Sequence, residues 1–466
     1  MKPITLYHRL PVFLQEAALS LYGARLRYNR YGGNHPRVLR DLKANAQLDA
    51  EGMTVLQQRL LRQALWHAAT RVPYYRELGV SAPDRPEDAV EALRRWPLLT
   101  KSAVQKAGLA LLEDGSRQSD LLQIHTGGTT GRALAIYTNA SALRQNYAFF
   151  ERFKQEAGIG PSLRVATFAG RPIVPSGQAN PPFWRRNYAS RQLLLSSYHI
   201  SPRTVDDYIK ALESWAPDWI DSYPSSLEPI ARRIVQRGGA RIQLQAIVTS
   251  SETLSAGARE VMERAFGCRV YDQYGSAEMV AFVAQCRAGQ YHIHSDYGYV
   301  ELLDEAGQPV PDGTPGEIVA TGFVNAVMPL VRYRMGDLAV RTSAPCTCGS
   351  PFPGVSGLLG RMDDVILTPS GRRIGRIDPI FKAVDTLHEA RVVQTAIDHI
   401  RLEAVISEGF SDSDRATLLH ELRLRVGEEM HLEFAAVPEI PRTRGGKLRM
   451  VESPYGRADR SSEVQN

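Results

Sequence analysis

The feature that most constrains the fold is an alternation of short apolar runs with helical segments that begins near residue 120. Apolar runs at residues 165–168, 246–248 and 270–274 alternate with segments of helical periodicity at 203–215 and 227–236. Short apolar runs of this length fit buried strands, and strands that alternate with helices are typical of sheets covered by helices. The sequence therefore predicts an α/β fold with sandwiched sheets.

The segments around this region predict a second, smaller domain. Residues 55–72 have apolar side chains at helical spacing up to Pro73, so we expect a helix there. Residues 299–303 and 317–321 read as antiparallel strands around turns. A glycine-rich stretch near 355–362 precedes a fresh α+β pattern, with a loop expected at 409–414. We predict a large N-terminal domain, residues 1–359, and a small C-terminal α+β domain, residues 360–466.

Composition limits the function classes. The 466 residues are 43% hydrophobic and 23% charged with a net charge of +6, and Lys and Arg are scattered, which favours anionic small substrates over nucleic acid. No run approaches the roughly 20 apolar residues of a membrane span, and residues 1–23 read as a packing helix, with an interfacial helix as the alternative. We expect a cytoplasmic enzyme with no stable membrane insertion; a homodimer stays open beside a monomer.

One glycine- and threonine-rich loop indicates phosphate binding. Its glycines allow close backbone approach, and its hydroxyl and N–H groups can surround phosphate oxygens. No Gly-Lys-Ser/Thr ends it, so it is not a Walker loop, and an ordinary turn is the alternative. The candidate residues are Thr126, Gly127, Gly128, Thr129, Thr130 and Gly131.

Three cysteines and a histidine form a second constellation: Cys286, His292, Cys346 and Cys348. Three thiolates and one imidazole are a common closed, tetrahedral set for structural Zn²⁺. The long gap between the two pairs leaves ordinary reduced thiols as the alternative. His294 is the competing imidazole, and we expect Cys268, which precedes a predicted strand, in the core.

Four further motifs follow the glycine-rich loop in order. They are Tyr-Gly-Ser-Ala-Glu from Tyr274, Tyr-Arg-Met-Gly-Asp from Tyr333, Gly-Arg-Met-Asp-Asp from Gly360 and Pro-Arg-Thr-Arg-Gly-Gly-Lys from Pro441. The ordered set resembles the adenylate-forming superfamily of acyl-CoA synthetases, peptide-synthetase adenylation domains and luciferases. Residues 56–102 are similar to the phenylacetate–CoA ligase family. Residues 196–201 and 217–227, with the N-terminal segment, look most like its capsule-biosynthesis (CapK-like) branch.

The resemblance implies an enzyme that uses ATP and Mg²⁺ to activate a carboxylic acid as an acyl-AMP. In such enzymes the large domain holds ATP and the acid, and the glycine-rich loop would hold the β- and γ-phosphates. Tyr274 would stack on adenine, opposite a wall that includes Ser251 and Glu252. Gly275 and Ser276 would complete the nucleotide site.

The same resemblance gives roles to five more side chains. Glu278 would hold Mg²⁺, a hard cation that prefers carboxylate and phosphate oxygens. Asp337 would accept hydrogen bonds from the two ribose hydroxyls, and Arg361 would donate to the same region. Lys447 would contact the carboxylate and the α-phosphate and stabilise charge that develops in the transition state. His199 falls where relatives line the acid pocket; packing is the alternative.

The acceptor of the acyl group is the open question. The resemblance implies a C-terminal lid with two orientations that hinges at Asp363 or Asp364. After the hinge the sequence departs from the Lys-x-x-Gly-type loop of many CoA ligases, although Arg372, Arg373 and Arg376 offer charge for the CoA phosphates. We expect transfer to a thiol, CoA. The alternatives are an amine or hydroxyl acceptor in a polysaccharide or natural-product pathway, and a non-catalytic nucleotide-binding protein.

Overall fold

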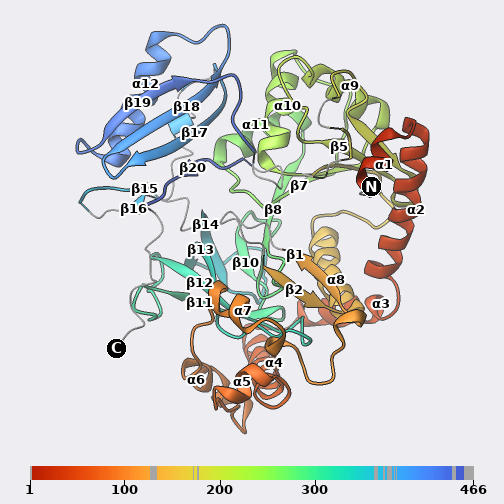
Figure 1. The fold of residues 1–466 in the computed structure, drawn as a ribbon, viewed down its shortest axis with the longest axis vertical. Helices are drawn as coiled ribbons and strands as arrows, with labels where there is room; N and C mark the ends of the chain where they lie inside the picture. Colours follow the sequence, from red (N-terminus) through yellow and green to blue (C-terminus); the bar gives the residue numbers. More distant parts are fainter. Residues whose placement is uncertain are drawn as a thin grey trace.

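The computed structural model describes residues 3–125, 134–169, 171, 173–175, 178–361, 366–370, 373–374, 380–381, 384, 386–442 and 448–455, which form a large and a small domain (Figure 1). The helices are α1 (Pro3–Arg9), α2 (Val12–Tyr31), α3 (His35–Asn45), α4 (Ala50–Arg71), α5 (Pro73–Glu77), α6 (Ala89–Arg94), α7 (Lys101–Ala107), α8 (Ala140–Glu156), α9 (Val205–Trp215), α10 (Pro224–Gln236), α11 (Ala256–Phe266) and α12 (Asp412–Val426). The strands are β1 (Leu122–His125), β2 (Ala135–Thr138), β3 (Val165–Ala169), β4 (Trp184–Asn187), β5 (Gln192–Ser196), β6 (Trp219–Ser222), β7 (Ala246–Ser250), β8 (Arg269–Gly275), β9 (Phe282–Gln285), β10 (Tyr291–Ile293), β11 (Gly298–Leu303), β12 (Pro315–Gly322), β13 (Tyr333–Thr342), β14 (Gly354–Arg361), β15 (Ile366–Leu367), β16 (Arg373–Ile374), β17 (Leu387–Ala396), β18 (His399–Ile406), β19 (His431–Ala436) and β20 (Val451–Glu452).

One sheet of twelve strands runs through the large domain in the order β11-β12-β13-β14-β10-β9-β8-β7-β6-β3-β5-β4. Strands β8, β7, β6, β3 and β5 are parallel to one another, and β4 joins them antiparallel at the edge. From β9 to β11 the remaining pairs are antiparallel. One continuous sheet therefore joins a parallel, helix-rich half to an antiparallel half.

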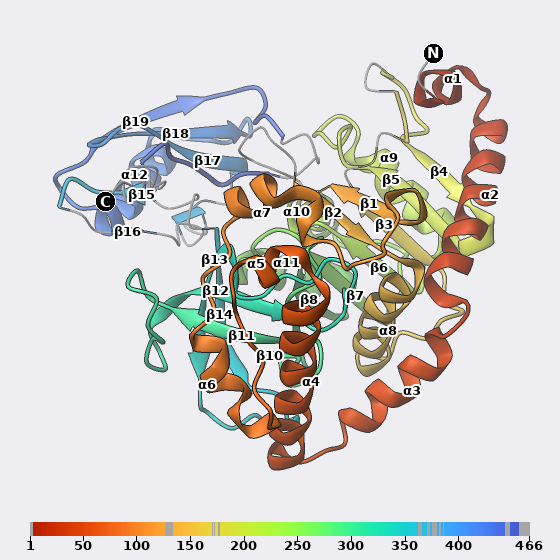
Figure 2. The same cartoon turned by 60° about the horizontal axis from the view of Figure 1, so that its bottom comes forward.

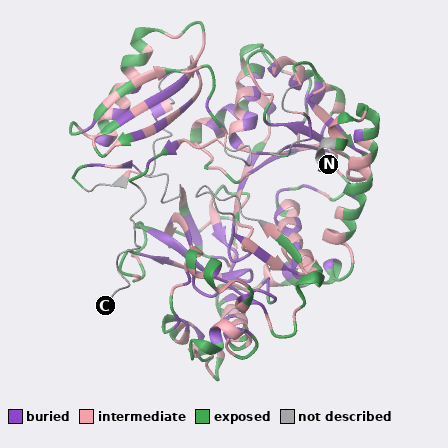
Figure 3. Cartoon of the chain, viewed as in Figure 1, coloured by how far each residue is buried: buried purple, intermediate pink, exposed green. Residues whose placement is uncertain are grey.

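Helices cover both faces of the parallel half, as the sequence predicts. Because side chains alternate along a strand, β7 sends Ile247 to a core with α9, α10 and α11, and Ala246 and Val248 to a core with α3 and α8. A third core joins the antiparallel half to α4, α5, α6 and α7. In Figure 3 the strands between these layers are largely buried, while the outer helices carry most of the exposed positions.

The long helix α2 lies along the β4 edge of the sheet (Figure 2). Arg185 of β4 is 1% exposed, and its Nε donates to the side-chain oxygen of Gln15 at 2.6 Å. The outer face of α2 is solvent-facing, with Phe13 68% and Leu21 76% exposed. The N-terminal segment is therefore a packing helix on its inner face. Among the described residues, no helix has both the length and the apolarity that a bilayer crossing requires.

The small domain has its own core. Strands β17 to β20 form a four-stranded sheet in the order β19-β18-β17-β20, and α12 packs against it. Every buried residue of this core lies between Ile366 and Val451. Strand β14, which belongs to the large sheet, ends at Arg361. The division near residue 360 stays a prediction.

Most elements expected from the sequence are present, and one expected loop is shorter than predicted because a helix begins within it. The expected antiparallel pair is β11 with β12, in which Tyr299 faces Thr321. The loop expected at 409–414 is wrong in part, because α12 begins at Asp412. Ser411 caps this helix, and its side chain and that of Asp414 satisfy each other's backbone N–H groups.

Candidate active site

Three of the expected nucleotide-site residues, Ser251, Gly275 and Ser276, line one pocket, here called the central pocket. It has a volume of about 340 Å³ and lies at the carboxyl ends of β3, β6, β7 and β8, where open α/β sheets bind ligands. Helix α8 supplies the opposite wall. Its lining residues are Tyr147, Phe150, Phe168, Arg171, Asp221, Ser222, Tyr223, Ser250, Ser251, Gln273, Gly275 and Ser276.

A tyrosine and an aspartate from distant strands are joined beside this pocket. The Tyr274 hydroxyl, on β8, donates to Oδ2 of Asp337, on β13, at 2.7 Å. Asp337 is paired in register with Arg361 on β14, although the Arg361 side chain lies outside the described residues. The structure thus brings together three positions that are far apart in the sequence.

Glu278 lies in the turn that follows β8. Its Oε1 accepts a hydrogen bond from the Tyr333 hydroxyl at 3.3 Å, and the side chain is half-buried. The next residue, Met279, has φ of 55°, a conformation that costs a non-glycine residue energy. The turn therefore holds Glu278 partly open to solvent, as a carboxylate that receives a cation must be.

Glu252 links the two domains. Its carboxylate accepts from the backbone N and Oγ of Ser225, both at 3.0 Å, and from the backbone N of Leu448 at 2.9 Å. Burial raises the pKa of this carboxyl group. Ser251, beside it, has φ of 71° and lines the central pocket. Glu252 therefore holds the C-terminal chain next to the position expected for Lys447.

Several expected site residues lie outside the described residues. They are Thr126, Gly127, Gly128, Thr129, Thr130, Gly131, Asp363, Asp364, Arg372, Arg376 and Lys447, and for Arg373 only the backbone is described. The strands that flank the glycine-rich loop are described. They form an antiparallel pair in which His125 faces Ala135. The loop therefore connects the two strands of a hairpin.

His199 is engaged within the protein. Its Nδ1 lies 2.8 Å from Ser196 Oγ, its Nε2 lies 3.1 Å from the Pro175 carbonyl oxygen, and its ring stacks on Phe183 with centroids 5.1 Å apart. It is not among the residues that line the central pocket. These contacts match the packing interpretation more closely than a role in the acid pocket.

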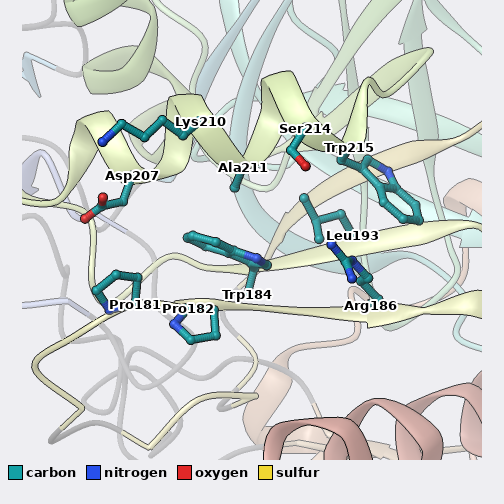
Figure 4. A pocket seen from close by; sticks show the side chains of 10 residues that line it. All are labelled: Pro181, Pro182, Trp184, Arg186, Leu193, Asp207, Lys210, Ala211, Ser214 and Trp215. Carbon is teal, nitrogen blue, oxygen red and sulfur yellow. The ribbon is translucent and has the colours of Figure 1, made fainter.

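Trp184 does not line the central pocket. It lines a separate hollow of about 400 Å³ on the outside of the domain, between β4, β5 and α9 (Figure 4). Pro182 and Trp215 line the same hollow. Because β4 is the edge strand, this hollow is remote from the strand ends that form the central pocket.

The four expected metal ligands meet in space. The candidate ligand atoms of Cys286, His292, Cys346 and Cys348 all lie within 4.8 Å of one another. Cys286 and His292 flank the turn between β9 and β10, and the other two cysteines lie in the loop between β13 and β14.

Hydrogen bonds distinguish His292, the expected metal ligand, from the competing His294. His292 Nδ1 lies 2.8 Å from the Phe352 carbonyl oxygen and so donates to it, which leaves Nε2 as an acceptor 3.4 Å from Cys348 Sγ. His294 points instead to Arg152, 2.5 Å from its Nδ1. The half-buried Cys268 packs against the core of the parallel half, as expected.

Sequence reasoning missed the polar end of the central pocket. Asp221, Arg171, Gln273 and Tyr147 line it, and none of them was given a role from the sequence, although Asp221 lies within the segment 217–227. One signal was available: Asp221 is a charged residue within a central parallel strand, where apolar residues are the rule.

Each of the two domains matches a family model. The family model described as AMP-binding enzyme matches residues 84–329, and the model described as CapK C-terminal domain matches residues 366–454. The chain belongs to the AMP-binding enzyme family.

Curated relatives and solved structures agree with this assignment. Protein CapK of Staphylococcus aureus is 26% identical over 459 residues, which cover 96% of this chain and 98% of that protein. Phenylacetate-coenzyme A ligase of Thermus thermophilus is 25% identical over 443 residues, or 87% and 97% of the two chains. The crystal structure of 2-hydroxyisobutyryl-CoA ligase in the postadenylation state has the same fold, with a TM-score of 0.67, 20% identity and coverage of 88% and 92%.

Proposed function

We propose that this enzyme activates a carboxylic acid with ATP and Mg²⁺ and passes the acyl group to a thiol, CoA. The observation that carries the proposal is the Tyr274–Asp337 hydrogen bond beside the central pocket. It joins a ring that can stack on adenine to a carboxylate that can accept from ribose hydroxyls. The AMP-binding family supports the same reading.

The described residues suit the first half-reaction. The acid carboxylate attacks the α-phosphorus of ATP, and pyrophosphate leaves. Glu278, half-buried near the pocket, would hold Mg²⁺, which neutralises phosphate charge. Lys447 would stabilise the negative charge that develops on the α-phosphate in the transition state. Its neighbour in the sequence, Leu448, is bonded to Glu252, and Glu252 adjoins Ser251 of the pocket. The glycine-rich loop would hold the leaving phosphates.

In the second half-reaction a thiolate attacks the acyl carbon and AMP leaves. The name of one relative, phenylacetate-coenzyme A ligase, supports CoA as the thiol. The sequence after Arg361, Ile-Leu-Thr-Pro-Ser-Gly-Arg-Arg, favours keeping an amine or hydroxyl acceptor as the second candidate, because it lacks the Lys-x-x-Gly pattern of many CoA ligases.

We also propose that Cys286, His292, Cys346 and Cys348 hold a structural Zn²⁺. The fit is supported by the donor set, three sulfurs and one imidazole nitrogen, and by the carbonyl of Phe352 that orients His292. All four protein ligands would close the coordination shell, so the metal would stabilise the fold and take no part in the reaction.

Acid-dependent ATP–pyrophosphate exchange over a panel of carboxylic acids tests the activity. Exchange with at least one acid is expected, followed by acyl-CoA, detected by mass spectrometry, when CoA is added. Accumulation of acyl-AMP without a thioester would overturn the CoA assignment and favour the amine or hydroxyl acceptor. ATP binding with no exchange for any acid would contradict the enzyme proposal.

A further inference from the structure

A carboxylate without a hydrogen-bond donor among the described residues lines the central pocket. Asp221 lies in β6, between β3 and β7, and is half-buried. The charges of Lys154 and Arg171 act on it. An acid that fills the pocket displaces the water around this carboxylate, so an acid that also supplies a hydrogen-bond donor would offset the cost of that displacement.

Other polar atoms at the same end also have unused hydrogen-bonding capacity. The Gln273 side-chain oxygen and the Ser276 hydroxyl are buried with no hydrogen-bond partner in the described structure. Tyr147 lines the pocket from α8, with the Arg30 guanidinium 4.5 Å from its ring centroid on the far side. Because Ser276 is expected to contact the nucleotide, Gln273 is the group that a purely apolar acid would leave unsatisfied.

The charges around Asp221 favour a neutral donor over a cation. Lys154 is paired with Glu151 at 2.8 Å, so its charge is largely matched. Arg171, which lines the pocket, has no ion pair among the described residues and faces the same space as Asp221. An ammonium group there would be attracted by Asp221 and repelled by Arg171. A hydroxyl can donate to Asp221 and accept from Arg171 or Tyr147 without this conflict.

We infer that the acid activated by this enzyme is a small hydroxylated carboxylic acid whose hydroxyl group is held by Asp221. The inference rests on the proposed function and names its substrate class. The pocket of about 340 Å³ also includes Ser251 and Gly275 of the nucleotide motifs, so the space for the acid is small. Gln273 and Tyr147 are positioned to complete the contacts of the hydroxyl group.

The test is pyrophosphate exchange with matched trios of acids that differ in one group. Suitable trios are lactate, propionate and alanine; β-hydroxybutyrate, butyrate and β-aminobutyrate; and para-hydroxybenzoate, benzoate and para-aminobenzoate. For at least one trio we expect kcat/KM of the hydroxy acid to exceed that of the unsubstituted acid by about a hundredfold, because sites built to bond a hydroxyl reject the analogue without it.

Variants at Asp221 connect this preference to the carboxylate. Asp221→Leu should reduce the hydroxy-to-unsubstituted ratio at least about tenfold, and Asp221→Asn, which keeps one acceptor oxygen, should lie between Leu and wild type. The KM for ATP should change little in either variant. Asp41→Asn, at an exposed position on α3, is the matched control and should behave as wild type. Thermal melting of each variant reports folding separately from specificity.

The outcomes separate the inference from the proposed function. Exchange that is best with unsubstituted or amino acids, or a ratio unchanged in folded Asp221→Leu, would overturn the hydroxy-acid assignment and leave the ligase standing. If protein that binds ATP shows no exchange with these or any other acids, the ligase proposal fails, and the substrate class fails with it.

Discussion

At the scale of single residues, one buried carboxyl group makes the stability depend on pH. Asp272 lies in β8, where its Oδ1 accepts from Thr249 at 2.6 Å and its Oδ2 from the Tyr291 hydroxyl at 2.7 Å. Burial, which outweighs these hydrogen bonds, raises the pKa of Asp272 from 3.8 to about 6. Because the native pKa lies above the unfolded one, protonation favours the folded state.

We therefore predict that the contribution of Asp272 is fully present below about pH 4 and is lost as the pH rises through about 6. The loss should be on the order of 3 kcal/mol. Asp272→Asn should flatten this part of the profile and gain stability relative to wild type at pH 8. Urea unfolding of both proteins between pH 4 and pH 8 measures the difference. If the unfolding free energy of wild type rose relative to that of Asp272→Asn as the pH increased, the prediction would be contradicted.

Among single residues, the sequence could predict those that belong to motifs. Tyr274, Asp337 and Glu278 were identified because each stands at a fixed place in an ordered set. Asp221 and Gln273 were given no role from the sequence, and the inference about them rests on the pocket that they line and on hydrogen-bond donors that are missing among the described residues. That property depends on three-dimensional packing, so it could not be inferred from the sequence beyond one charged residue in an apolar strand.

At the scale of elements, the cysteine-rich segment joins the β9–β10 hairpin to the loop after β13. Cys346 follows Cys286 by sixty positions, and β10, β11, β12 and β13 lie between them. A metal that closes so long a loop restricts the unfolded chain, which stabilises the fold.

We predict that the purified protein contains about one equivalent of zinc by elemental analysis. Cys348→Ser should lower the melting temperature by several degrees and leave the KM for ATP nearly unchanged, because the cluster lies outside the central pocket. Cys268→Ser is the control for loss of a thiol outside the cluster, and should keep the zinc. Fully folded, active wild-type protein without metal would refute the structural role.

Element types were more predictable than their order in space. The periodicity of residues 55–72 and the apolar runs at 165–168 and 246–248 correspond to α4, β3 and β7. Strand order was not predictable, since β14 pairs with β10 and β3 lies between β5 and β6. Such pairings depend on which distant segments bury one another's faces. The periodicity of one segment does not contain that information.

At the scale of the whole molecule, the position of the C-terminal domain determines what Lys447 can do. The backbone N–H of Leu448 donates to Glu252 of the large domain, while Lys447 itself lies outside the described residues. The resemblance implies a second orientation in which it withdraws. The fold class was predicted from the alternation of apolar runs with helical segments, and the small domain from the fresh α+β pattern after residue 360. The relative orientation was not, since each domain has its own core and packs separately.

We predict that Lys447→Ala slows adenylation about 10²–10³-fold and leaves transfer from a preformed acyl-AMP nearly unchanged, because its charge acts while pyrophosphate leaves. Pyrophosphate exchange measures the first step, and thioester formation from synthetic acyl-AMP and CoA measures the second. Arg449→Ala, two residues away, serves as the comparison. Equal losses in both steps for Lys447→Ala would argue against a domain that changes orientation between them.

The bond from Leu448 to Glu252 also bears on the populations of those orientations. Of the hydrogen bonds whose two partners are both described, it is the one that joins the domains, and Ser225 still donates to the same carboxylate when it breaks. Because the acceptor is a carboxylate, breaking it would cost about 1.5–3 kcal/mol, an equilibrium factor of roughly 13 to 160. A bias of this size can be exceeded by ligand affinities that differ between two conformations. As far as this contact is concerned, the free enzyme would sample both orientations, and the bound nucleotide would select between them.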